Sequence, residues 1–107
     1  MIGEYISALS NSAALCERPK AYLVWGVQDD THEIVGTEFQ YRKMKKGNEE
    51  LEAWLSRMLF PRINFRFFEI SMENGIVVLL EIPCAEKQPV QFAGAEYIRI
   101  GTNKKNL

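Results

Sequence analysis

The chain has 107 residues, the size of one domain, and its 47% hydrophobic content is enough to bury one core. No apolar run approaches the roughly 18 residues of a membrane span and no secretion signal is visible, so a cytoplasmic protein without a membrane partner is expected. The formal net charge of −1 excludes a domain that is basic as a whole, so any surface that binds nucleic acid has to be local.

The N-terminal part of the chain is predicted to form a helix followed by a hairpin. Apolar residues recur with helical spacing from the first residues onward, at Ile2, Tyr5, Ile6 and Leu9. Pro19 prevents this helix from continuing past Arg18. Residues 21–27 are mainly β-branched and aromatic, which predicts a buried strand, and a short strand over residues 33–35 is expected to pair with it.

A second helix is predicted after an irregular, basic segment over residues 37–47, which is expected to be a loop or a solvated turn. Asn48 is the expected N-cap, and two glutamates follow it at the positive end of the helix dipole. Apolar residues then repeat with helical spacing at Leu51, Trp54, Leu55, Met58 and Leu59. Pro61 ends the helix.

The C-terminal part is predicted to contain three strands. Residues 63–70 change the parity of their apolar positions, so this strand carries a bulge or buries both faces. The Asn74-Gly75 pair predicts a tight hairpin into residues 76–82, whose continuous apolar run is typical of a central strand. Residues 96–100 alternate as the last strand. The expected fold is α+β, with two main helices packed on a mixed or antiparallel sheet.

Several catalytic chemistries find no support in the residues. The glycines do not form a phosphate-binding loop or a dinucleotide fingerprint, so no cofactor is expected. His32 is the one histidine of the chain and lies in a predicted turn, without an evident partner for nucleophilic catalysis. Cys16 and Cys84 are far apart and are interpreted as reduced thiols, which favours the cytosol.

The acidic turn after the first strand is the one place where ligands for a hard cation or a general base could gather. It holds Asp29 and Asp30, followed by His32 and Glu33. Aspartates also favour turns because they bind their own backbone, and a solvated hairpin turn is the preferred interpretation. No metal site is therefore predicted, although Asp29 and Asp30 stay candidates for one.

A basic cluster is the strongest candidate for a binding surface. Tyr41 is followed by four cations within five residues, at Arg42, Lys43, Lys45 and Lys46. Such a composition suits phosphate binding combined with stacking on one base, and it also suits a plain soluble loop; both interpretations stay open. Arg99, on the last predicted strand, is either the cation of a groove or an exposed strand residue. Trp25 and Trp54 lie in apolar patterns and are assigned to the core.

Four segments follow one another in a characteristic order: YISALSN, YLVWGVQDD with IVG soon after, IPCAEKQPV and EYIRIGTNK. This succession, from about Tyr5 to Thr102, resembles the AlbA-like domain of Schlafen-type proteins. The matching positions are Ser7, Ala8, Asn11, Gly26, Val27, Asp29, Asp30, Val35, Gly36, Tyr97, Arg99, Gly101 and Thr102. The resemblance implies a single AlbA-like domain over residues 1–107.

The resemblance also implies a function, because similar domains serve as DNA-binding modules of bacterial and archaeal transcriptional regulators. In animal Schlafens a similar domain contributes to a metal-dependent ribonuclease that cleaves transfer RNA, and Asp29 resembles one of its three carboxylates. The other two lie on an upstream strand, which is expected to be missing because the chain begins directly at the first helix. The family's Gly-Gly pair is replaced by the longer ALCERPKAY, so a close approach of phosphate to that turn is not expected.

The leading hypothesis is therefore a non-catalytic module that binds nucleic acid, DNA rather than RNA, mainly by charge and shape. Its expected contacts are Arg42, Lys43, Lys45, Lys46 and Arg99. Two alternatives stay open. One is a remnant or complementable ribonuclease that uses Asp29, with or without Asp30. The other is a protein-interaction domain that forms a homodimer through the sheet edge exposed by the missing first strand.

Overall fold

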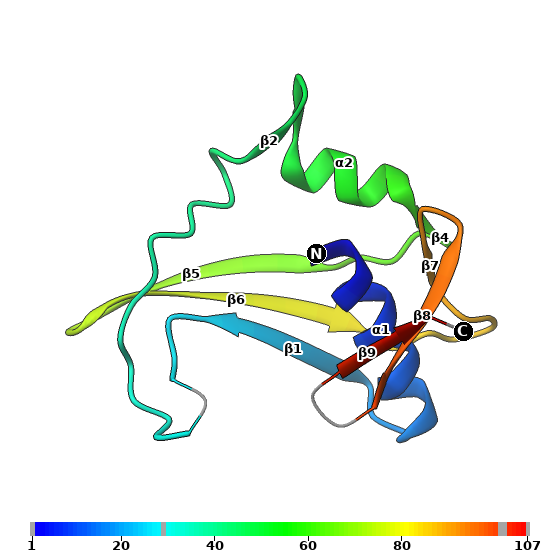
Figure 1. Cartoon of the computed structure of the whole chain (residues 1–107), viewed down its shortest axis with the longest axis horizontal. Coiled ribbons are helices and arrows are strands. Elements are labelled where there is room, and N and C mark those ends of the chain that lie inside the picture. Colours follow the sequence, from blue (N-terminus) through cyan, green and yellow to red (C-terminus); the bar gives the residue numbers. More distant parts are fainter. Residues whose placement is uncertain (1, 29, 101–102, 107) are drawn as a thin grey trace.

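A computed structural model describes residues 2–28, 30–100 and 103–106 of the chain (Figure 1). The helices in this part are α1 (Ile2–Leu15) and α2 (Leu51–Met58). The strands are β1 (Lys20–Trp25), β2 (Lys45–Lys46), β3 (Glu49–Glu50), β4 (Leu59–Phe60), β5 (Arg66–Met72), β6 (Gly75–Pro83), β7 (Gln91–Phe92), β8 (Ala95–Ile100) and β9 (Asn103–Asn106). None of the helices described is long and apolar enough to cross a bilayer.

The main sheet has the order β1-β6-β5, and both pairings are antiparallel. β6 is its central strand, as its apolar run predicts, and the tight Asn74-Gly75 turn joins it to β5. One face of this sheet is covered by α1, which packs against β1 and β6. Val78, Leu80 and Ile82 of β6 are fully buried on that face, beneath Ile6 and Leu9 of α1.

The second sheet has the order β4-β7-β8-β9, also antiparallel throughout. Helix α1 also packs against β8 of this sheet, so it contacts strands of both sheets. Helix α2 contributes Leu51 and Leu55 to the same core and precedes β4 directly. The two helices and the antiparallel sheets confirm the predicted α+β fold class.

Polar side chains on α1 join the helix to the C-terminal half of the chain. The Ser7 hydroxyl donates to the Val90 carbonyl at 2.7 Å and accepts the Tyr97 N–H at 3.1 Å. Asn11 donates to the same Val90 carbonyl at 3.0 Å, and Ser10 donates to the Pro83 carbonyl at 2.7 Å. Each buried hydroxyl or amide therefore has backbone partners, which offsets the cost of removing it from water.

The structure corrects three predictions about local elements. The strand expected over residues 33–35 is reduced to a single bridge between Val27 and Ile34, because β1 ends at Trp25 and Gly26, with a φ of 101°, interrupts the extended backbone before the bridge. Asn48 is not an N-cap, because Gly47 and Asn48 form the turn between β2 and β3, and Glu50 occupies the cap position. Residues 96–100 are not the last strand, because β9 pairs with β8.

Candidate nucleic-acid interface

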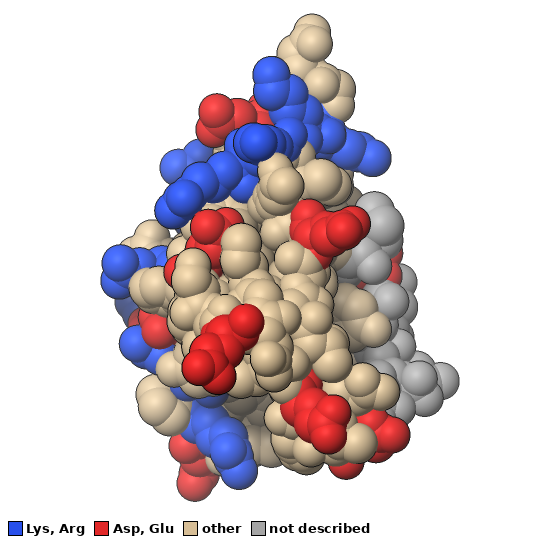
Figure 2. Space-filling model, turned by 90° about the vertical axis from the view of Figure 1, so that its left-hand side faces the viewer, with Lys and Arg blue, Asp and Glu red and all other residues tan. Residues whose placement is uncertain are grey.

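The four cations of the basic cluster lie on one exposed segment, which runs from the turn after Tyr41 through β2. We call this set, Arg42, Lys43, Lys45 and Lys46, the basic loop, and all four side chains are exposed. Figure 2 views the molecule from the left-hand side of Figure 1. It shows Lys and Arg side chains gathered near the top, with Asp and Glu side chains mostly below them. The basic loop therefore presents its charges together on an open surface.

Tyr41 anchors the basic loop and is not available for stacking on a base. Its side chain is only 4% exposed, and its ring stacks on Phe67 of β5 with 4.6 Å between the ring centroids. The Arg42 guanidinium lies over the Tyr41 ring, 5.3 Å from its centroid. The suggestion that Tyr41 stacks on a nucleobase is wrong, because the apolar core already occupies that ring.

The short β2–β3 hairpin fixes the second half of the basic loop. Lys45 pairs with Glu50 and Lys46 with Glu49 across the hairpin, so each lysine has a glutamate opposite it. The Glu49 carboxylate, however, binds Arg57 of α2 through two contacts of 2.9 and 3.2 Å. These hydrogen bonds to Arg57 lower the pKa of the Glu49 carboxyl and raise the pKa of the guanidinium. Glu49 therefore pairs with Arg57 of α2. The Lys46 ammonium instead contacts the Trp54 ring.

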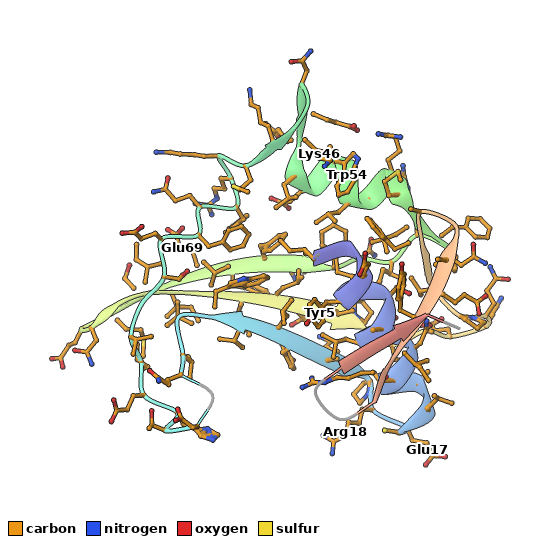
Figure 3. The ribbon with its side chains drawn as sticks, in the orientation of Figure 1. Tyr5, Glu17, Arg18, Lys46, Trp54 and Glu69 are labelled. Carbon is orange, nitrogen blue, oxygen red and sulfur yellow. The ribbon has the colours of Figure 1, made fainter. Side chains whose placement is uncertain are left out.

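Arg99 lies on a different surface from the basic loop. It lines a pocket of about 410 Å³ at the C-terminal end of α1, together with Arg18 and Lys20. In Figure 3, Arg18 and Lys46 are labelled at opposite ends of the molecule. The structure thus brings four of the five predicted binding residues together and separates the fifth from them.

A cleft between α1, β1 and α2 adjoins the basic loop and was not foreseen from the sequence. Its volume is about 590 Å³, and the residues that line it are Ile2, Tyr5, Leu23, Trp25, Met44, Lys45, Lys46, Leu51, Trp54 and Leu55. The Lys46 ammonium lies over the Trp54 ring, 5.4 Å from its centroid. Both tryptophans pack against the core as predicted, yet each is only partly buried and also lines this cleft.

The acidic turn provides no assembled metal site among the residues that the structure describes. Asp29 falls outside them. The Asp30 carboxylate accepts the N–H of the next residue, Thr31, at 2.9 Å, so its contact is local to the turn. No group of three His, Cys, Asp or Glu side chains suited to a metal ion occurs in the described part of the chain.

Cys16 and Cys84 are both free thiols.

Several residues that carry the family resemblance hold the fold together. Ser7 and Asn11 form the hydrogen bonds that join α1 to Val90 and β8. Gly26 and Gly36 have positive φ angles of 101° and 78° and approach other backbone segments closely. The sequence signature therefore identifies the architecture more than it identifies a ligand.

Comparison with known proteins confirms the family resemblance. The family model described as Schlafen, AlbA_2 matches residues 1–107. No curated protein and no solved structure matches the chain. The match to the family model covers every residue, and the structure has the α+β arrangement that the resemblance implies. The chain belongs to the Schlafen AlbA_2 family.

Proposed function

We propose that this protein is a non-catalytic nucleic-acid-binding module that contacts phosphates through the basic loop and serves a transcriptional regulator. The observation that carries the proposal is the gathering of Arg42, Lys43, Lys45 and Lys46 on one exposed segment of a protein whose net charge is −1. Such a local group of cations attracts a polyanion even though the whole domain is not basic. Membership of the Schlafen AlbA_2 family supports a role related to nucleic acid.

The anchoring of the basic loop also supports this proposal. Tyr41 is stacked in the core at one end, and the β2–β3 hairpin holds the other end. Phosphate contacts made from a fixed segment cost less conformational entropy than contacts made from a disordered tail. The resemblance to modules of regulators favours DNA as the partner over RNA. Contacts of this kind position a protein on DNA without reading its sequence.

Replacing all four cations of the basic loop by glutamine is expected to remove most of the salt dependence of DNA binding. Each phosphate contact contributes about 0.9 to the slope of log K against log salt for duplex DNA, so four contacts contribute roughly 3.6. A rise from about 50 to about 200 mM salt would then weaken the wild-type complex about 150-fold. Fluorescence anisotropy of a labelled duplex at several salt concentrations measures both slopes.

A matched control removes four other exposed cations, by the substitutions Arg18→Gln, Lys20→Gln, Lys87→Gln and Arg99→Gln. This variant has the same net charge as the first one, and it tests whether Arg99 contributes from its separate surface. We expect it to keep a steep slope close to that of the wild type. Equal losses in the two variants would exclude the basic loop as the contact surface, and an absence of wild-type binding at low salt would refute the proposal.

Weak self-association is a second candidate function, favoured by the outer face of the main sheet. This face points away from α1, and several of its side chains are exposed and apolar, among them Tyr22, Val24 and Ile70. The three strands have six, seven and nine residues. Three strands of about seven residues span roughly 14 by 24 Å, or about 340 Å². A stable interface needs about 800 Å² from each partner, so we propose that a second copy binds this face only weakly.

Light scattering over a concentration series is expected to show a mass that rises from monomer toward dimer. The substitution Ile70→Lys should abolish this rise, because it places an unpaired charge in the centre of the apolar face. Lys87→Glu, on an exposed segment elsewhere, serves as the control and should leave the rise unchanged. A monomer mass at every concentration would contradict this second candidate.

A further inference from the structure

Three aromatic side chains from three different elements line the cleft beside the basic loop. Tyr5 comes from α1, Trp25 from β1 and Trp54 from α2. Figure 3 shows Lys46 and Trp54 together at the hairpin end of α2, above Tyr5 of α1. At about 590 Å³ the cleft lies within the range of about 300 to 1,000 Å³ that small-molecule sites occupy. Its walls offer flat π surfaces of the kind on which nucleobases stack.

Cations lie on the same cleft as these aromatic rings. Lys45 and Lys46 both line it, and the Lys46 ammonium lies 5.4 Å from the centre of the Trp54 ring. Both lysines belong to the basic loop, so a strand whose phosphates contact the loop has a base within reach of the cleft. An aromatic surface beside positive charge is complementary to a flat base attached to an anionic backbone.

The aromatic rings are held in place before any ligand binds. Trp54 contacts Phe92 edge to face with 5.5 Å between the ring centroids, and Trp25 contacts Phe39 at 4.7 Å. Because both tryptophans are only partly buried, part of each side chain stays accessible. A fixed platform loses little side-chain entropy on binding, so the cleft is prepared to receive a planar group.

We propose that this cleft accepts one unpaired nucleobase, which takes the place of the Lys46 ammonium over the Trp54 ring, while the basic loop, Lys46 included, contacts the neighbouring phosphates. The proposal rests on the proposed function, because the loop must bring the strand to the cleft. It adds that the module prefers DNA with unstacked bases, as in a single strand, over an intact duplex, whose bases are already stacked. Stacking does not depend on base identity, so binding stays tolerant of sequence.

Two oligonucleotides of equal length test the proposal because they differ only in their bases. One is a ten-nucleotide oligothymidylate, and the other carries abasic residues in place of thymidines and keeps all of its phosphates. Wild-type protein is expected to bind the thymidine strand about tenfold more tightly, the effect of stacking one base on an aromatic ring. The same titration should quench tryptophan fluorescence with the thymidine strand alone.

Substitutions at Trp54 assign the effect to the cleft. Trp54→Leu should reduce the ratio of the two affinities to about one, whereas Trp54→Phe should keep most of it, because phenylalanine preserves a π surface. Phe60→Leu, which removes an exposed aromatic ring from β4, is the matched control and should keep the full ratio. A loss of the ratio in Phe60→Leu with retention in Trp54→Leu would overturn the assignment.

The outcomes separate this inference from the proposed function. If wild-type protein binds both strands equally and the basic-loop variant abolishes that binding, the cleft proposal is wrong and the phosphate contacts remain. If neither strand nor duplex binds, both proposals fail. The wild-type ratio decides the question even if Trp54→Leu does not fold, because that measurement needs no variant.

Discussion

Replacing Asn11 by alanine is expected to lower the free energy of unfolding by about 3 kcal/mol, because buried backbone groups would lose their partners. The Asn11 side chain is 5% exposed and donates to the carbonyls of Val90 and Tyr97 at 3.0 and 2.8 Å. Its carbonyl oxygen accepts the Val90 N–H at 2.7 Å. The Ser7 hydroxyl continues to serve the Val90 carbonyl, but no other side chain described here replaces the bond to the Val90 N–H.

Urea unfolding followed by circular dichroism measures this loss. For a slope of about 1.5 kcal/mol per molar urea, the midpoint should fall by roughly 2 M. Asn64→Ala removes the same side chain from an exposed position and should change the free energy of unfolding by no more than about 0.5 kcal/mol. Similar losses in the two variants would show that the hydrogen bonds of Asn11 do not stabilise the attachment of α1 to β8.

Long elements with a regular apolar pattern could be predicted from the sequence. The helical spacing of Ile2, Tyr5 and Leu9 predicts α1, and the apolar run of residues 76–82 with its Asn-Gly turn predicts β6 and the β5–β6 hairpin. These features depend on local patterns that hydrophobic burial and turn geometry enforce. The fold class follows from them and is confirmed, and the family, which is identified from the succession of four sequence segments, is confirmed by the match to its model.

Short strands could not be predicted, because so few residues carry no pattern of their own. β4 and β7 have two residues each, which is too few for an alternating pattern to appear. β2 and β3 consist of lysines and glutamates, which are depleted in strands, and the same residues made Asn48 resemble an N-cap. Pairing between segments distant in sequence forms β4 and β7, whereas the turn at Gly47 and Asn48 overrides local propensity in β2 and β3.

The candidate site could be predicted only where its residues are adjacent in sequence. The basic loop is contiguous, and its exposure follows from its charge, so Arg42 to Lys46 stay together. Arg99 is remote in sequence, and nothing in its strand pattern indicates which surface it shares. Trp54 fits the apolar repeat of α2, and only the position of Lys46 over its ring reveals a second role.

Replacing Gly36 by alanine is expected to lower the free energy of unfolding by about 2 to 3 kcal/mol, which is more than the loss expected for the same change at Gly47. At Gly36, φ is 78°, and an added Cβ would lie 3.1 Å from the Gly75 Cα and 3.2 Å from the Asn74 carbonyl oxygen. Both are backbone atoms of the tight β5–β6 turn, so the contact cannot be relieved by rotating a side chain. Backbone strain and close contact therefore add.

Gly47→Ala is the matched control, because Gly47 also has a positive φ, of 64°, but an added Cβ there would meet no atom within 4 Å. It should cost only the backbone strain, about 1 kcal/mol, and the difference between the two variants in a thermal or urea unfolding series isolates the close approach. Equal losses would show that the approach of Gly36 to Gly75 carries no energetic penalty for a larger residue.

The contact at Gly36 also connects stability with the proposed binding surface. Directly after it, the Thr37 N–H donates to the Ile76 carbonyl at 2.8 Å, and the chain then runs to Tyr41 and the basic loop. A shifted Gly36 would displace the start of this segment while leaving all four cations present. Gly36→Ala is therefore expected to weaken DNA binding severalfold without changing the salt slope, whereas removal of the cations changes the slope itself.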